Sequence, residues 1–195
     1  MSAILDVLSR SLDANVVSAI GERIGGDAQA TGTVVSAAVP LLLSALTRNA
    51  SQPEGADALH QAVVRDHSGA ILDHLPEHLA EPQAANGAGI LRHVLGDQEG
   101  AIEQGLAGSA GLDAGSVGQI LQIVAPIVMG ALGKATQQRS LDAGGLASVL
   151  GSEQQEVQAA APDLMAQVGT LLSAGDQGGG GSLLGDILGS LLGRR

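Results

Sequence analysis

Apolar residues recur every three or four positions along most of this chain, which is the pattern of amphipathic helices. The spacing predicts a helix over residues 1–12 and two longer helices around apolar stripes at 34–46 and 120–132. A further stripe covers 152–173 and is interrupted by Pro162. No stretch shows the alternation and the β-branched and aromatic residues typical of strands. We therefore predict an all-α protein.

The two long stripes belong to an internal repeat. Shifting the chain by 86 positions superimposes identical residues, namely Gly25 on Gly111, Asp27 on Asp113, Pro40 on Pro126 and Leu46 on Leu132. Ahead of each stripe, the Gly can end one helix and the Asp can cap the next. Each Pro lacks an N–H and lies inside the helical pattern, so a kink or break is expected there. We predict two pseudo-repeated helical units, 1–97 and 98–174, followed by a tail over 175–195.

The tail has the most unusual local pattern, because glycine stands at every fourth position from 181 to 193. On a helix this arrangement separates a small or polar face from an apolar face. The expected interaction residues are Leu183, Leu184, Ile187, Leu188, Leu191 and Leu192 on the apolar face and Gly185 and Gly189 on the small one. Each interior Gly costs about 1 kcal/mol relative to Ala, so this helix needs a surface to pack against. The Gly178–Gly181 run before it is expected to act as a flexible tether.

Three surfaces could receive the tail: the body of the same chain, a second copy or a different protein, and a lipid surface. Asp186 and a net charge of −11 oppose anionic lipid, so contact with a membrane surface is not expected. The first 12 residues lack the features of a secretory signal, since Asp6 and Arg10 interrupt them. No continuous apolar run reaches the length of a spanning helix, about 18 residues. We expect a cytoplasmic protein without a transmembrane span.

Composition excludes several functional classes. The chain contains no Cys, Phe, Tyr or Trp, so it can build no disulfide, zinc–thiolate site, cysteine nucleophile or aromatic base-stacking platform. The acidic balance also disfavours a partner with a phosphate backbone. DNA binding through the two Gly–Asp turns, which resemble a helix-turn-helix connection, stays open as an alternative function.

Histidine is the side chain most suited to chemistry here. Four histidines, at 60, 67, 74 and 78, have spacings that would align them on a continuous helix, as in helical metal sites. Gly69 and Pro76 oppose that continuity, so we expect solvated or capping histidines and keep metal binding as an alternative. No nucleophile elbow or phosphate-binding loop is present. We predict no enzymatic activity, no catalytic residue, no metal and no cofactor.

Five segments carry a family resemblance. They are the N-terminal amphipathic helix, AVPLLLSALTRNASQP (38–53), DHSGAILDH (66–74), NGAGILRHVLGD (86–97) and QIVAPIVMGALGK, which ends at Lys134, and the Gly/Leu tail accompanies them. Together they resemble the bacterial domain-of-unknown-function family 937. The resemblance implies a helical bacterial protein, distantly similar to small proteins with a homeodomain-like fold. It supplies no catalytic residue; His93 and Asp97 are the positions to test first if chemistry were found.

These patterns favour a non-enzymatic protein that associates with itself or with another protein through amphipathic helices. The expected mechanism is helix-in-groove docking of the tail on a helical body.

Overall fold

A computed structural model describes residues 3–162, 165–166 and 168–170. Within that part of the chain the secondary structure is helical and no strand occurs, which confirms the all-α prediction. The α-helices are α1 (Ala3–Ser11), α2 (Ala14–Ile24), α3 (Ala28–Asn49), α4 (Pro53–Asp66), α5 (Leu75–Ala80), α6 (Gly87–Leu95), α7 (Glu99–Ala110), α8 (Ala114–Arg139) and α9 (Ala143–Ala160). Short 3₁₀ turns lie at Ala70–Asp73, Pro82–Ala85 and Gly96–Gln98.

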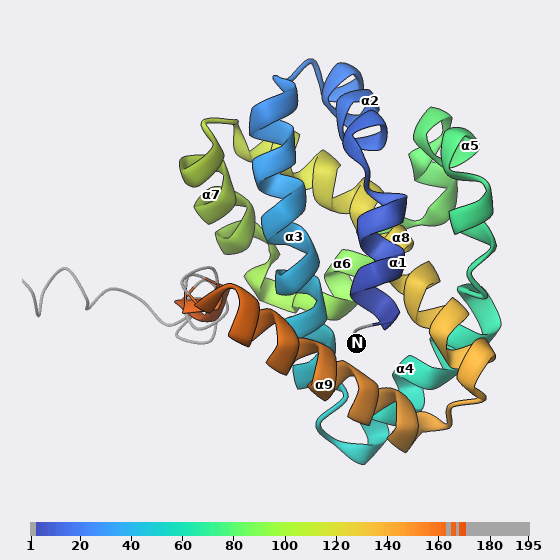
Figure 1. Ribbon diagram of the computed structural model, residues 1–195. Coiled ribbons are helices and arrows are strands. Elements are labelled where there is room, and N and C mark those ends of the chain that lie inside the picture. The colour runs from blue at the N-terminus through green and yellow to red at the C-terminus, as the bar shows by residue number, and fades with distance from the viewer. Residues whose placement is uncertain (1–2, 163–164, 167, 171–195) are drawn as a thin grey trace, which may run out of the picture.

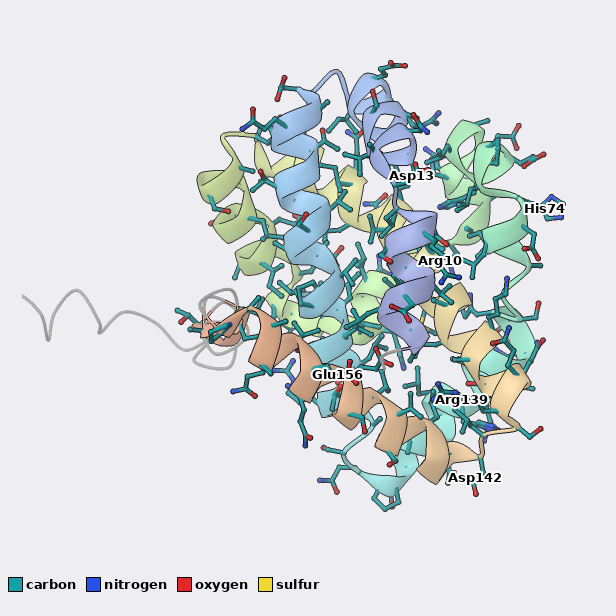
Figure 2. The ribbon with its side chains drawn as sticks, viewed as in Figure 1. Arg10, Asp13, His74, Arg139, Asp142 and Glu156 are labelled. Carbon is teal, nitrogen blue, oxygen red and sulfur yellow. The ribbon has the colours of Figure 1, made fainter. Side chains whose placement is uncertain are left out.

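Aspartates begin four of these helices. The Asp27 carboxylate accepts hydrogen bonds from the N–H groups of Gln29 and Ala30 at 2.8 and 3.1 Å, and Asp113 accepts one from the N–H of Ser116 at 2.9 Å. These bonds satisfy donors that lack a partner within the helix. Asp13 and Asp142 cap α2 and α9 in the same way, at the turns marked in Figure 2.

Glycine ends the helix before each of the two long apolar stripes. Gly25 closes α2 with φ 68° and Gly111 closes α7 with φ 71°, both in the left-handed region that favours glycine. Both predicted Gly–Asp turns are therefore confirmed.

Helix α8 lies at the centre of the fold. It packs against α1, α3, α4, α6 and α7, and Figure 1 shows it crossing behind α3 and α1. Every residue from Ile123 to Gly133 is buried, as is every residue of α3 from Pro40 to Leu46. The sequence predicted one apolar face on each helix, but their middle turns are buried on all sides because neighbouring helices surround them.

Two helices, α3 and α8, are long and apolar enough to cross a membrane by length and composition. This finding corrects the expectation that no apolar segment reaches that length. Burial inside the fold covers 67% of the apolar window in α3 and 78% of that in α8. Core helices of this kind satisfy the same length and hydropathy criteria as membrane spans.

Neither internal proline breaks its helix, since α3 continues through Pro40 and α8 through Pro126. Of the kink or break expected at each proline, the break is therefore wrong. Near Pro126, groups from neighbouring segments lie against backbone carbonyls of α8. The Nε2 atom of His78 lies 2.9 Å from the Ile123 carbonyl oxygen, and a Cβ on Gly87 would collide with the Gln122 carbonyl. The middle turns of α8 are enclosed by neighbouring helices, which keeps the helix continuous there.

One hydrophobic core joins both predicted units, because α3 packs against α8 and α9, and α4 packs against the same two helices. The division at residue 97 remains a prediction. Glu153 links α9 to the first turn of α1, since its buried carboxylate accepts hydrogen bonds from the N–H groups of Ile4 and Leu5 at 3.3 and 3.2 Å. Burial raises the pKa of this carboxyl.

The predicted last stripe is divided at Pro162, as expected, because α9 ends at Ala160. Val157 and Val168 of that stripe are buried. The tail and its expected interaction residues lie outside the described residues, namely Leu183, Leu184, Gly185, Ile187, Leu188, Gly189, Leu191 and Leu192.

Candidate functional site

A trough lies between α4 and α6, and we name it the α4/α6 trough. Both helices pack on α8, but they make almost no contact with each other. The space between them has a volume of about 530 Å³. Its lining is formed by Leu46, Asn49, Gly55, Ala58, Leu59, Ala62, His67, Asn86, Gly89, Ile90, His93, Val94 and Met129.

The trough has small residues along one wall. Gly55, Ala58 and Ala62 stand along α4 at three- and four-residue spacing, so they share one side of that helix. A Cβ at Gly55 would collide with the Asn49 carbonyl, which shows how closely the start of α4 approaches the end of α3. Small side chains keep this wall low and allow another helix backbone to approach closely.

The two ends of the trough differ. At one end, the Asn49 Nδ2 atom donates a hydrogen bond to the Val94 carbonyl oxygen at 3.1 Å and ties α3 to the end of α6. At the other end, the trough meets a second hollow at His67, Asn86 and Ile90, which line both. Asn86 adopts a left-handed conformation with φ 52° and begins α6.

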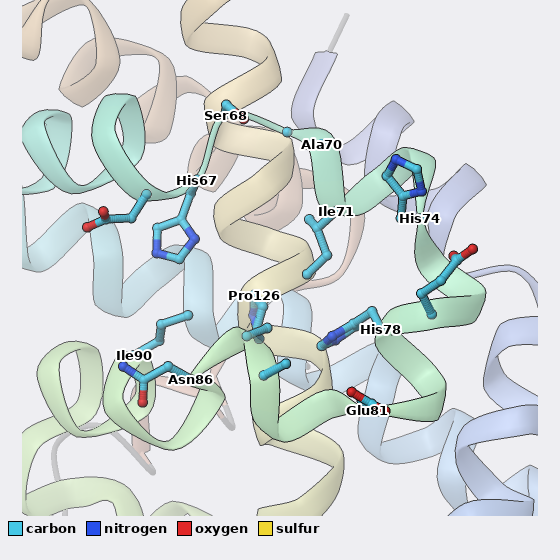
Figure 3. Close-up of a pocket in the computed structure, with 15 residues that line it drawn as sticks. His67, Ser68, Ala70, Ile71, His74, His78, Glu81, Asn86, Ile90 and Pro126 are labelled. Carbon is cyan, nitrogen blue, oxygen red and sulfur yellow. The ribbon is translucent and has the colours of Figure 1, made fainter.

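The second hollow, which we name the acidic hollow, has a volume of about 650 Å³ (Figure 3). Its carboxylates are Asp66, Glu77 and Glu81. Arg65 holds Asp66 through contacts of 2.8 to 3.0 Å, which lower the pKa of that carboxyl. Within the described part of the chain, no basic side chain forms an ion pair with Glu77 or Glu81. The hollow therefore presents two uncompensated negative charges beside the α4/α6 trough.

The loop between α4 and α5 lies directly on α8. A Cβ on Gly133 would collide with the His67 carbonyl, and one on Gly130 would press against Ile71. Gly69 makes the turn with φ 94°. The loop can approach α8 this closely only where α8 carries glycine. The DHSGAILDH and IVMGALGK motifs therefore contact each other at these glycines.

The histidines do not align on one continuous helix, because α4 ends at Asp66 before the loop that contains Gly69. His60 lies with its Nε2 2.9 Å from the Leu141 carbonyl oxygen, His78 is buried against α8, and His74 is exposed and points away from the body in Figure 2. His67 is half-buried, which lowers its pKa. Among the described residues, no three His, Asp or Glu side chains form a group that could hold a metal ion.

Two further positions singled out from the sequence, His93 and Asp97, have different surroundings. His93 lines the trough, whereas Asp97 is exposed in the turn that follows α6. Sequence reasoning missed the trough itself, because it depends on how α4 and α6 sit on α8. The only local signal was the row of Gly and Ala at 55, 58 and 62.

A third hollow lies between α3 and α7, where the described chain ends. Val168 and Thr170 line it together with Gly32, Ser36 and Gly105. Val168 is 2% exposed, so this segment already packs on the body. The chain therefore passes toward its tail beside α3 and α7.

Comparison with known proteins places the chain in one family. No curated protein matches it, and no solved structure does. The family model described as "Bacterial protein of unknown function (DUF937)" matches residues 6–135, which is more than half of the chain and includes α2 to α7 with most of α8. The chain belongs to the DUF937 family.

Proposed function

We propose that this protein is a non-enzymatic association module in which the apolar face of its C-terminal segment, residues 182–193, docks on a helical body. The observation that carries the proposal is the uncovered trough between α4 and α6. Its volume of about 530 Å³ falls in the range of surface pockets that bind ligands, about 300–1,000 Å³. Docking an amphipathic helix in such a groove is a common mode of recognition.

The energetics favour docking over an isolated tail helix. Six large aliphatic side chains in residues 183–192 contribute roughly 1.5 to 3 kcal/mol each when fully buried. The interior glycines cost about 1 kcal/mol each. Burial therefore outweighs the glycine cost only when a receiving surface is present, which supports a role for the segment in association with a second copy or another protein.

The alternative functions receive less support. A DNA-binding helix-turn-helix exposes its second helix, but α3 and α8, which follow the two Gly–Asp turns, form the core. The histidine alignment needed for a helical metal site is not formed. We therefore propose neither a nucleic-acid partner nor a cofactor, and we keep the proposed site of action in the cytoplasm.

Light scattering coupled to size-exclusion chromatography tests the proposal. Concentration is followed by refractive index, because the chain has no Trp or Tyr. A chain ending at Gly175 keeps every described residue. We expect the full chain to form an assembly larger than its 19.3 kDa mass and the shortened chain to be a monomer. Equal numbers of chains in both assemblies would overturn the proposal.

A full-length variant gives a matched comparison. Replacing Leu184, Leu188 and Leu191 by Ser makes the apolar face polar and is expected to release monomers. Replacing Ser182 and Ser190 by Ala changes the opposite face and is expected to leave the assembly intact.

A further inference from the structure

We infer that residues 171–175 dock in the hollow between α3 and α7 of their own chain, as a strap that fixes where the tail leaves the body. The strap goes beyond the proposed function and does not depend on it, because it involves the segment before the Gly-rich run and not the Leu/Ile face of the tail. The α3/α7 hollow is the equivalent, in the second half of an internal repeat, of a groove that the chain already fills elsewhere.

The repeat extends through the segments that follow α4 and α9. With the same shift of 86 positions, residues 76–89 (PEHLAEPQAANGAG) superimpose on residues 162–175 (PDLMAQVGTLLSAG). The identical pairs are Pro76 and Pro162, Ala80 and Ala166, Ala88 and Ala174, and Gly89 and Gly175. An acidic residue also follows each proline. Matched proline, glycine and acidic positions in register indicate that the two segments have equivalent places in the fold.

The helices around these two segments are equivalent as well. The shift places α2 on α7 and α3 on α8, and α3 packs against α7 as α8 packs against α2. The residues of α2 and α8 that line the groove between them are Arg23, Gln119, Gln122 and Ile123. Their equivalents, which all line the α3/α7 hollow, are Ser109, Thr33, Ser36 and Ala37. The α2/α8 groove and the α3/α7 hollow are therefore counterparts.

The segment that follows α4 fills the α2/α8 groove. The Arg23 Nη1 atom donates a hydrogen bond to the Ala80 carbonyl oxygen at 3.0 Å. The Nε2 atom of His78 lies 2.9 Å from the carbonyl oxygen of Ile123, whose side chain is 2% exposed. With this segment in place, a space of about 330 Å³ is left in the groove.

The described chain ends inside the counterpart. Figure 1 shows the end of α9 beside α7, and Val168 and Thr170 line the α3/α7 hollow. The described residues leave a larger space there, about 950 Å³, and Ser36 is exposed while Ala37 is half-buried. Because Thr170 already lies in the hollow, the residues that follow it are within one helical turn of the open part. A second copy would have to pack over this segment or displace it, so we assign the hollow to the same chain.

The residues of the strap fit this space. Leu171 and Leu172 follow Val168 at three and four positions, so on a helix they share the side of Val168 that already packs on the body. Gly32 of α3 and Gly105 of α7 line the hollow and leave room for larger side chains to approach both helices closely. The strap supplies the aliphatic bulk, and the hollow supplies the small residues.

Docking of the strap shortens the tether of the tail. Without it, the tether covers the eleven residues 171–181, and a flexible coil of that length averages about 18 Å. With the strap docked, the six residues 176–181 remain and average about 13 Å. The tail is therefore confined to the surroundings of α3 and α7.

The rate of thiol labelling at position 36 tests the strap in the full chain. Ser36→Cys places a single thiol at the hollow, and its alkylation by iodoacetamide is followed by mass spectrometry. We expect Leu171→Ser/Leu172→Ser to speed labelling at least about fivefold, because the strap then no longer covers the thiol. The matched control Asp176→Ser/Gln177→Ser, directly after the strap, should change the rate less than about twofold. Ala101→Cys, on the exposed surface of α7, should be labelled at one rate in all backgrounds. Equal rates at position 36 with and without the two leucines would overturn the inference.

Two shortened chains and a dilution series identify what covers the thiol. A chain ending at Gly175 should protect it as well as the full chain does, and a chain ending at Thr170 should not. Protection that needs residues beyond Gly175, or that is lost on dilution, would assign the hollow to the tail or to a second copy and overturn the inference. The chain ending at Gly175 lacks residues 182–193, so this result is independent of the proposed association, and either idea can fail without the other.

Discussion

Glu153 allows the link between α9 and α1 to be tested quantitatively. Its side chain is 3% exposed and accepts hydrogen bonds from the N–H groups of Ile4 and Leu5, in the first turn of α1. Replacing it by Ala leaves two backbone donors without this acceptor in a buried site. Hydrogen bonds to a charged acceptor are worth about 1.5–3 kcal/mol each, and water entering the new space recovers part of that. We therefore expect Glu153→Ala to lower the free energy of unfolding by about 2–3 kcal/mol.

Glu153→Gln separates hydrogen bonding from charge. Gln keeps one acceptor oxygen and carries no charge, so the cost of burying a carboxylate is removed. The expected loss in the free energy of unfolding is therefore under about 1 kcal/mol. The exposed neighbour Gln155 provides a control, since Gln155→Ala is expected to change stability by less than about 0.5 kcal/mol. Urea unfolding followed by far-ultraviolet circular dichroism measures all three, because the chain has no Trp or Tyr for fluorescence.

The same residue predicts a pH dependence. Burial raises the pKa of the Glu153 carboxyl above its ordinary 4.5. The hydrogen bonds from Ile4 and Leu5 oppose this rise, as does Arg139, whereas Glu156 adds to it. The folded state therefore binds this proton more tightly than the unfolded state does. The contribution is present below pH 4.5 and is lost as the pH rises through the folded pKa. Glu153→Gln should remove that slope; a slope unchanged from the parent chain, or equal losses for the Ala and Gln variants, would refute the reasoning.

Three further predictions follow from local contacts, each measured by the same unfolding assay. Gly133→Ala is expected to destabilise the fold by about 1–3 kcal/mol, because the added Cβ would collide with the His67 carbonyl. Gly151→Ala is the control: there is open space around Gly151, so the change should stabilise by about 0.5–1 kcal/mol. Stability changes of the same sign for both variants would contradict the contact between the loop and α8. Burial lowers the pKa of His67 in the folded state below its ordinary 6.5. Its contribution to stability is therefore expected to be fully present above pH 6.5 and to be lost as the pH falls from there through the lower folded pKa, and His67→Gln should flatten this dependence; an unchanged slope would argue against the burial. Asp113→Ala should lower the free energy of unfolding by about 0.5–2 kcal/mol, because α8 loses its N-terminal cap. Asp57 caps no helix, so Asp57→Ala should leave stability nearly unchanged. Equal effects of the two changes would rule out capping.

Helix ends, helix caps and the helical class were predictable from the sequence because they depend on residues close together in the chain. A Gly followed two residues later by an Asp marks the end of one helix and the start of the next, and the structure confirms this at Gly25–Asp27 and Gly111–Asp113. The helical class follows from the three- and four-residue spacing. The end of α9 before Pro162 follows from proline's missing N–H.

Features that depend on tertiary packing could not be read from the sequence. A kink or break at Pro126 was predicted from the effect of proline on its own helix, but α8 is enclosed by its neighbours and does not break. The contact of Glu153 with Ile4 joins residues 149 positions apart and has no local signature. The trough arises because α4 and α6 pack on α8 without packing on each other, which hydrophobic spacing within either helix does not determine.

The absence of cysteine from the chain permits a direct measurement of the proposed association through the tail. One chain carries Ala58→Cys in the α4/α6 trough, and a second chain carries Leu188→Cys on the apolar face of the tail. The two are mixed, allowed to exchange and oxidised mildly, and the products are separated on a non-reducing gel. We expect a disulfide-linked heterodimer of the two chains, and much less of it when Ala101→Cys on the exposed surface of α7 replaces the trough cysteine. A heterodimer yield equal to that of the α7 control would contradict docking of the tail in the trough of a second copy.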